Sequence, residues 1–171
     1  LSALKTYSDS NIKDFVLIAL STGARKSNIL SMKWENIDLD IGKWLIPKTK
    51  TDQNVTLPLV PIIVDILKKR KQYDISNSVW VFPAHSKSGH IESTGKAFKK
   101  LMEKANIEHI RIHDLRHTLA SYMVASGTNP FIVQRALTHR NIQSTQVYVN
   151  LDVEFIRPYF DETVSKIMGI V

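Results

Sequence analysis

The residues of this sequence best suited to chemistry are cationic or nucleophilic side chains that stand in short motifs along the chain. In chain order they are Arg25, Lys50, His113, Arg116, His139 and Tyr148. Nucleophilic attack on a phosphodiester builds negative charge on its non-bridging oxygens, so preorganised cations aimed at those oxygens provide most of the catalysis. Arginine suits this task because its planar guanidinium binds phosphate through two hydrogen bonds and stays charged. The set therefore predicts a phosphodiester site.

Proton transfer at such a site needs groups of suitable pKa. Lys50 lies in a predicted hairpin turn, where it could protonate the leaving oxygen, and Lys48 is the competing candidate for this role. His113 and His139 titrate near neutrality, so each could donate to the phosphate or move the proton of a nucleophile.

Tyr148, nine residues after His139, is the first candidate for a nucleophile. Attack by a tyrosine on phosphorus forms a phosphotyrosine ester that conserves the bond energy, so strands can be rejoined without ATP. Tyr159 is the second candidate. Tyr122 shares a predicted helix with Arg116, and we expect it to lie in the core.

Three histidines raise the alternative of a zinc site. His109, His113 and His117 are spaced so that one helix would place all three on one face. No glutamate stands beside them as in helical metalloprotease motifs, and residues 110–112 alternate as an extended segment does. We therefore expect His109 to precede the helix, which disfavours zinc. His117 is expected to orient the surroundings of Arg116 or to pack in the core.

The composition agrees with a polyanionic partner. The 171 residues carry 23 Lys and Arg against 16 Asp and Glu, a net charge of +7, and the pI is about 9.6. The absence of cysteine excludes disulfides and thiolate metal sites. No apolar run approaches the ~20 residues of a membrane span. The start at Leu1, without an initiator Met, predicts a piece whose N-terminal neighbour is missing.

The hydrophobic pattern predicts a mostly helical α+β domain. Helices are expected over residues 12–21, 25–34, 61–73, 94–106 and 113–126, and shorter helical segments over residues 130–138, 144–148 and 159–168. Three strands over residues 37–39, 44–47 and 55–57 form a predicted antiparallel meander, and residues 79–82 a further short strand. The helix over residues 61–73 is expected to turn Ile62, Ile63, Ile66 and Leu67 toward the core.

The order of these motifs resembles the C-terminal catalytic domain of the tyrosine recombinases, also called phage integrases. The matching features are an arginine after Thr-Gly, a hairpin lysine, His-x-x-Arg, Leu-x-His and a following tyrosine. The resemblance assigns the catalytic roles to Arg25, Lys50, His113, Arg116, His139 and Tyr148. Two positions differ from the usual pattern: Asn28 stands where an acidic residue is common, and Thr138 where glycine is common. Neither change removes a catalytic group.

This resemblance implies a site-specific recombinase that cuts and rejoins duplex DNA through a 3′-phosphotyrosyl link, without metal or cofactor. It also implies a homotetramer at paired sites and a monomer when free. Residues 1–171 would be one catalytic domain, the N-terminal DNA-clamping domain being absent from this chain. The tail over residues 158–171 is expected to dock on a neighbouring protomer or on its own domain. The expected location is the cytoplasm of a bacterium, at the nucleoid, for a bacterial or phage protein.

Four lysines are the candidates for DNA contact, namely Lys87, Lys96, Lys99 and Lys100. Their alternative interpretation is an ordinary solvated surface. Two other functions remain open: a type IB topoisomerase, which shares this chemistry, and a DNA-binding module without catalysis. A two-metal nuclease is disfavoured because it needs clustered carboxylates, and Asp114 and Asp152 are the only candidates near the motifs.

Overall fold

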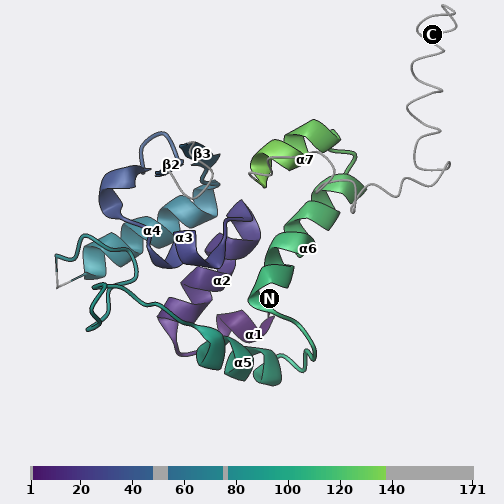
Figure 1. The fold of residues 1–171 in the computed structure, drawn as a ribbon. Coiled ribbons are helices and arrows are strands. Elements are labelled where there is room, and N and C mark those ends of the chain that lie inside the picture. The colour runs from purple at the N-terminus through teal and green to yellow at the C-terminus, as the bar shows by residue number, and fades with distance from the viewer. Residues whose placement is uncertain (1, 48–53, 75–76, 138–171) are drawn as a thin grey trace, which may run out of the picture.

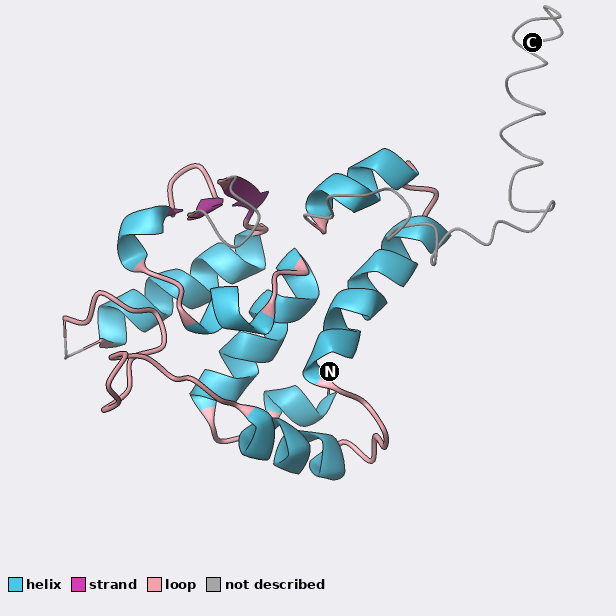
Figure 2. Cartoon of the chain, in the orientation of Figure 1, coloured by secondary structure: helices cyan, strands magenta, loops and turns pink. Residues whose placement is uncertain are grey.

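The computed structural model describes residues 2–47, 54–74 and 77–137, which fold as a group of helices with a small sheet at one edge, beside α4 (Figures 1 and 2). The helices are α1 Ser2–Lys5, α2 Ser10–Thr22, α3 Lys26–Leu30, the 3-10 turn η1 Trp34–Asn36, α4 Pro61–Tyr73, α5 Gly95–Lys104, α6 Ile112–Ala125 and α7 Pro130–Ala136. The strands are β1 Ile37–Asp38, β2 Lys43–Ile46 and β3 Val55–Pro58. Within these ranges no helix combines the length and apolar character needed to cross a membrane.

Helix α2 is the central helix of the core. The Asp9 carboxylate caps its start by accepting from the backbone N–H groups of Asn11 and Ile12 at 2.9 and 3.2 Å. Apolar residues at helical spacing follow, and Phe15 and Ile18 are fully buried. α2 packs against α3, α4 and α6, so its C-terminal end lies where several elements meet.

The predicted three-stranded meander is confirmed. The strands pair antiparallel in the order β1-β2-β3, with Trp44 opposite both Ile37 and Leu57. Alternation along β2 buries Trp44 and Ile46 and exposes Lys43 and Leu45, as the two-residue period of a strand requires. Residues 48–53, with Lys48 and Lys50, lie outside the described residues.

Two predicted elements differ from the structure. The helix expected over residues 25–34 ends at Leu30, and residues 79–82 form a single bridge, between Lys33 and Trp80, in place of a strand. The backbone N–H of Trp34 donates to Val79 and that of Val81 donates to Met32. Because the chain turns into η1 at Trp34, this pairing has no partner strand along which to extend.

Helix α4 has the predicted bounds, but its buried face is narrower than expected. Ile63 and Leu67, one turn apart, are fully buried, and Ile66 is half-buried. Ile62 is 61% exposed and points away from the core, which corrects its predicted inward orientation. A helix that packs on one side buries one stripe, and Ile62 falls outside it.

Arg70 joins three parts of the fold from its place on α4. Its guanidinium donates to Asp14 on α2 at 2.7 Å, to Asn11 at 2.8 Å, and to the Val81 carbonyl at 3.0 and 3.2 Å. The same group lies 4.5 Å from the Phe82 ring centroid. The Arg70 and Asp14 side chains are only 13% and 17% exposed, so this ion pair is largely removed from water.

We expect Arg70→Ala to lower the free energy of unfolding by about 3–5 kcal/mol, because it leaves the Asp14 carboxylate and the Val81 carbonyl in a dry environment without their donor. In a chain of this size the thermal midpoint should fall on the order of 10 °C. The neighbouring, exposed Lys69→Ala is the matched control, with almost no expected shift. Equal melting of the two variants would contradict this role for Arg70.

Candidate active site

The turn that presents Arg25 is built by the two residues Thr22 and Gly23. The buried Thr22 hydroxyl donates to the Ile18 carbonyl at 2.7 Å and accepts from the Ala24 N–H at 3.2 Å. Gly23 ends α2 in the left-handed conformation, with φ of 61°. Arg25 then caps the start of α3 with an extended backbone and an exposed side chain. The prediction that Arg25 lies at a helix start is confirmed.

Gly23 is also held by tertiary packing. A Cβ atom there would lie 2.9 Å from the Leu137 side chain and 3.0 Å from that of Leu119. A side chain there would displace the ends of the Leu119 and Leu137 side chains, in addition to straining the left-handed backbone. The position of Arg25 thus depends on the docking of α2 against α6 and the end of α7.

Arg116 ties the same three elements together. It lies on α6, is only 4% exposed, and donates from Nη1 to the Gly23 carbonyl at 2.5 Å and from Nη2 to the Leu137 carbonyl. Buried guanidinium groups require such partners. Sequence reasoning selected Arg116 as a phosphate ligand but did not predict that it organises the backbone of the site, since no sequence pattern marks a carbonyl as its partner.

His113 lies one helical turn before Arg116 and His117, on the same face of α6. Its exposed ring meets the His117 ring edge to face, with centroids 4.7 Å apart and an interplanar angle of 84°. Partial burial lowers the pKa of His113 below its usual 6.5, and the positive charges of His117 and Arg116 lower this pKa further. The neutral imidazole is therefore favoured at pH 7, where it can accept a proton.

Asp114, which follows His113, acts as a helix cap. Its carboxylate accepts from the Arg111 backbone N–H at 2.7 Å and pairs with the Arg111 guanidinium at 3.1 Å. The side-chain hydrogen bonds from Arg111 hold the pKa of Asp114 below its usual value, so this carboxylate stays ionised at neutral pH. The arrangement fixes the first turn of α6, from which His113 and Arg116 project.

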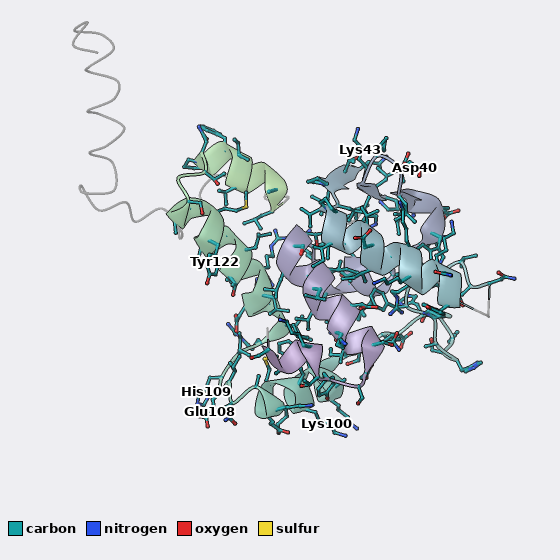
Figure 3. All side chains as sticks on the ribbon, turned by 180° about the vertical axis from the view of Figure 1, so that it is seen from behind. Asp40, Lys43, Lys100, Glu108, His109 and Tyr122 are labelled. Carbon is teal, nitrogen blue, oxygen red and sulfur yellow. The ribbon has the colours of Figure 1, made fainter. Side chains whose placement is uncertain are left out.

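The histidine cluster considered for zinc is not assembled around one helix face. α6 begins at Ile112, so His109 precedes the helix, as predicted, with a left-handed φ of 60° and an exposed ring (Figure 3). In the described ranges, no three His, Cys, Asp or Glu side chains are arranged to hold a metal ion.

Among the predicted site residues, Arg25, His113 and Arg116 are described. Arg116 lies one turn after His113 on α6 and binds the Gly23 carbonyl, two residues before Arg25. Lys50, His139 and Tyr148 lie outside the described residues, as do their competitors Lys48 and Tyr159. The Leu137 carbonyl that Arg116 binds stands two residues before His139 in the sequence. Tyr122 is 71% exposed on α6, so the expectation that it lies in the core is wrong (Figure 3).

The lysines predicted to contact DNA are all exposed. Lys96, Lys99 and Lys100 share one face of α5, opposite the buried Phe98 and Leu101. Lys99 forms only a loose ion pair with Glu103, at 3.8 Å and in full contact with water, and such a pair contributes little to stability. Lys87 lies in the loop before α5. These positions allow DNA contact, which stays a prediction.

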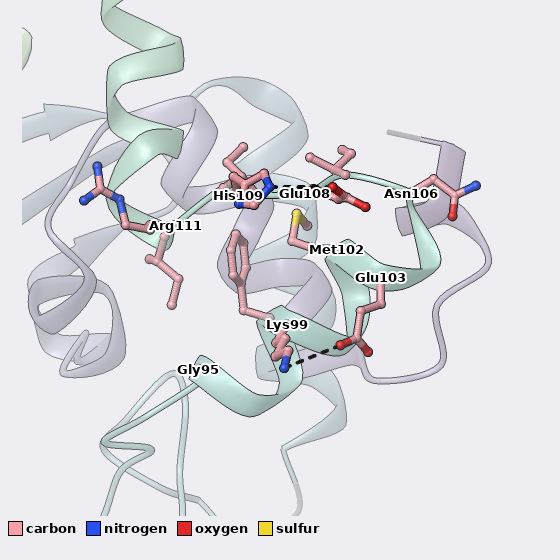
Figure 4. Close-up of a pocket in the computed structure, with 12 residues that line it drawn as sticks. Gly95, Lys99, Met102, Glu103, Asn106, Glu108, His109 and Arg111 are labelled. Atoms are coloured by element: carbon pink, nitrogen blue, oxygen red, sulfur yellow. Dashed lines mark ion pairs between the residues drawn. The ribbon is translucent and has the colours of Figure 1, made fainter.

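A cavity of about 620 Å³ lies beside α5, away from Arg25 and Arg116 (Figure 4). It is lined by α5 and residues 106–112, with Phe98 and Met102 among its apolar lining, and it is open to solvent on one side. Arg25, His113 and Arg116 do not line it. The candidate site is therefore the junction of α2, α6 and α7 rather than this cavity.

The sequence is similar to a known protein family and to individual members of it. A profile described as the phage integrase family matches residues 1–154. The integrase of Salmonella phage P22 is 30% identical over 155 residues, which cover 82% of this chain and 39% of that integrase. The tyrosine recombinase XerD of Rhizobium meliloti is 30% identical over 138 residues, covering 77% of this chain and 44% of XerD. The chain thus spans less than half the length of these relatives.

Two solved structures share the fold. The Tn1549 transposon integrase, in complex with circular intermediate DNA, has a TM-score of 0.79 at 18% identity, covering 95% of this chain and 64% of that one. The catalytic domain of bacteriophage HP1 integrase has a TM-score of 0.68 at 22% identity, covering 91% of this chain and 84% of that one. The predicted α+β fold, mostly helical with a small antiparallel sheet, is confirmed as the one these catalytic domains have.

Proposed function

The chain belongs to the phage integrase family, and from this premise we propose that it is the catalytic domain of a tyrosine-type site-specific DNA recombinase. In this proposal the Tyr148 hydroxyl attacks a phosphorus of duplex DNA. A bond forms between the tyrosine oxygen and phosphorus, and the bond from phosphorus to the 5′ oxygen breaks. The product is a 3′-phosphotyrosyl link with a free 5′-hydroxyl. Reversal of the step, with a 5′-hydroxyl from another strand, rejoins the DNA without ATP.

The observation that carries the proposal is the pair of hydrogen bonds made by Arg116. One goes to the carbonyl of Gly23, two residues before Arg25, and the other to the carbonyl of Leu137, two residues before His139. These two bonds tie Arg116 to the segment that leads into Arg25 and to the last described residue, Leu137. They support the proposal that cationic groups from three separate motifs converge on one point. Such a convergence suits a phosphodiester, whose transition state gains negative charge.

Each residue takes one role in this reaction. Arg25 and Arg116 stabilise the charge on the non-bridging oxygens, and His139 donates to the same phosphate. His113, neutral at pH 7, accepts the proton that Tyr148 loses. Lys50 gives a proton to the leaving 5′ oxygen. None of these roles requires a metal ion or cofactor.

The relatives support DNA as the partner. The XerD relative is named a tyrosine recombinase, and the Tn1549 integrase was solved with circular intermediate DNA. We propose by analogy that four copies assemble on paired DNA sites and that the free chain is a monomer. Residues 158–171, rich in apolar residues, would dock on the neighbouring copy in that assembly. Because its proposed substrate is chromosomal or phage DNA, we propose that the protein acts at the nucleoid, in the cytoplasm.

The decisive experiment is covalent trapping on a nicked suicide duplex, which loses the 5′-hydroxyl strand after cleavage and so cannot be rejoined. We expect a protein–DNA band that survives denaturation, with Tyr148 in the linked peptide. Binding without a covalent band would indicate a non-catalytic DNA-binding module. Relaxation of supercoiled DNA by the monomer, without paired sites, would indicate a topoisomerase.

The lysine face of α5 gives a separate prediction about affinity. If Lys96 and Lys100 contact phosphates, binding to duplex DNA weakens steeply with salt, and each lost contact lowers the log–log salt slope by about 0.9. A double Lys96→Ala, Lys100→Ala variant should therefore lower this slope by about 2, measured by fluorescence anisotropy. The exposed pair Lys68 and Lys69 on α4, changed to alanine, is the control. Equal slopes in both variants would identify the α5 lysines as an ordinary solvated surface.

A further inference from the structure

We propose that His117 is a positioning residue for His113: contact between the two rings selects the His113 rotamer and fixes the direction in which its nitrogens face the phosphate. The inference rests on the proposed function, because that function places His113 at the reacting phosphate. It extends the function by giving His117, which the reaction itself does not use, a defined task.

The contact between the rings is well defined. The two histidines are four residues apart on α6, so they stand one above the other on one face of the helix. Their ring centroids are 4.7 Å apart at 84°, an edge-to-face geometry that aromatic pairs favour. The His113 side chain is exposed and the His117 side chain is half-buried. The more buried ring is therefore the support and the exposed ring is the group held in place.

The backbone beneath the two rings is rigid. Arg116 lies between them in the sequence, is buried, and is fixed by its bonds to the Gly23 and Leu137 carbonyls. The Arg111–Asp114 cap fixes the turn on the other side of His113. With the backbone held at both ends of this turn, the remaining freedom of His113 is rotation about its own side-chain bonds. The His117 ring restricts that rotation.

A histidine in the supporting position also affects the charge of His113. Burial and then the neighbouring charges of His117 and Arg116 lower the pKa of His113, Arg111 adds to this, and Asp114 opposes it. Helices α2 and α7 pack against α6. The described charged side chains on α2 are Lys13 and Asp14, and Arg25 stands just after α2. A lowered pKa means that His113 is protonated only at more acidic pH. Proton acceptance by His113 is therefore available at neutral pH and is lost as the pH falls.

Two substitutions separate positioning from simple packing. His117→Ala removes the supporting ring, whereas His117→Phe keeps a ring of similar shape without charge. The exposed His109→Ala serves as the control, since it removes a histidine outside the helix. Each variant of the full 171-residue chain is measured in three ways: His113 titration by NMR, the His113 side-chain coupling constants that report its rotamer, and the rate of covalent trapping on the nicked duplex.

We expect His117→Ala to raise the pKa of His113 toward 6.5, to average its rotamers, and to slow trapping at pH 7 about tenfold, a fraction of the effect of a general base. His117→Phe should keep a single rotamer and a trapping rate near that of the wild type, while the pKa of His113 still rises. His109→Ala should change none of the three. If His117→Ala unfolds the domain, His117→Phe is compared with the wild type instead. A single His113 rotamer and a raised pKa of His113 in His117→Phe would then support the proposal.

Unchanged titration and unchanged rotamer averaging of His113 in His117→Ala would overturn the proposal, whatever happens to the rate. A trapping rate in His117→Phe as low as in His117→Ala would also overturn it, because a supporting ring would then be insufficient. A wild-type chain that forms no covalent product would refute the proposed function. The NMR measurements need no DNA cleavage, so they would still show whether His117 positions His113.

Discussion

Replacement of Tyr148 by phenylalanine is expected to abolish the covalent DNA product completely. The substitution removes a single hydroxyl, the atom that forms the bond to phosphorus, and no other residue can supply it in the same place. Folding and DNA binding should stay close to those of the wild type, because the ring is kept. Denaturing electrophoresis after incubation with the nicked duplex measures the covalent product, and fluorescence anisotropy measures binding.

The control for this variant is Tyr159→Phe, which changes the second candidate tyrosine in the same way. It should form the covalent product at the wild-type rate. A covalent band that persists in Tyr148→Phe and disappears in Tyr159→Phe would move the nucleophile to Tyr159. If Tyr148→Phe also lost DNA binding, the hydroxyl would be needed for binding DNA rather than for the cleavage reaction.

Loss of either arginine should slow cleavage by at least ~10²-fold, the typical effect of removing one preorganised donor to a transition state. The two variants should differ in stability. Arg25 is exposed, so Arg25→Ala should melt like the wild type. Arg116 is buried, and Arg116→Ala leaves the carbonyls of Gly23 and Leu137 unpaired, at about 1–3 kcal/mol for each. Thermal melting and trapping rates together test this contrast.

Two further variants make the comparison specific. Lys26→Ala removes the exposed cation next to Arg25 and should leave the cleavage rate within a few-fold of the wild type. Arg116→Lys keeps the charge but loses the planar group that reaches both carbonyls, so it should remain slow. A fast Arg116→Lys enzyme would show that charge alone is needed at this position. A slow Lys26→Ala enzyme would show that the rate follows the net charge of the surface rather than Arg25.

Local sequence patterns were sufficient to predict much of the fold and the candidate residues. The period of apolar residues predicted α2 and α4, and alternation predicted the meander of β1, β2 and β3. The helix predicted over residues 12–21 matches α2, which ends at Gly23 with a left-handed backbone. These features depend on neighbours within a few residues, which is the range over which a sequence pattern carries information.

Three of the failures concern partners that are distant along the chain. Residues 79–82 have strand-like composition, but their partner segment turns away after Lys33 and Trp34. Ile62 and Tyr122 are apolar or aromatic, yet none of the described elements packs over them, and both are exposed. An apolar side chain is buried only where another element covers it, and its own sequence does not specify that element.

At the candidate site, too, some features follow from the local sequence and others from contacts between distant segments. The sequence by itself determined which side chains are present: the arginines, histidines, lysine and tyrosine, with types and spacing suited to a phosphodiester. Only the tertiary structure decided that Arg116 is buried and holds the carbonyls of Gly23 and Leu137, which are 93 and 21 residues away from it. A guanidinium leaves water only when acceptors surround it, and those acceptors exist only after α2, α6 and α7 have packed together.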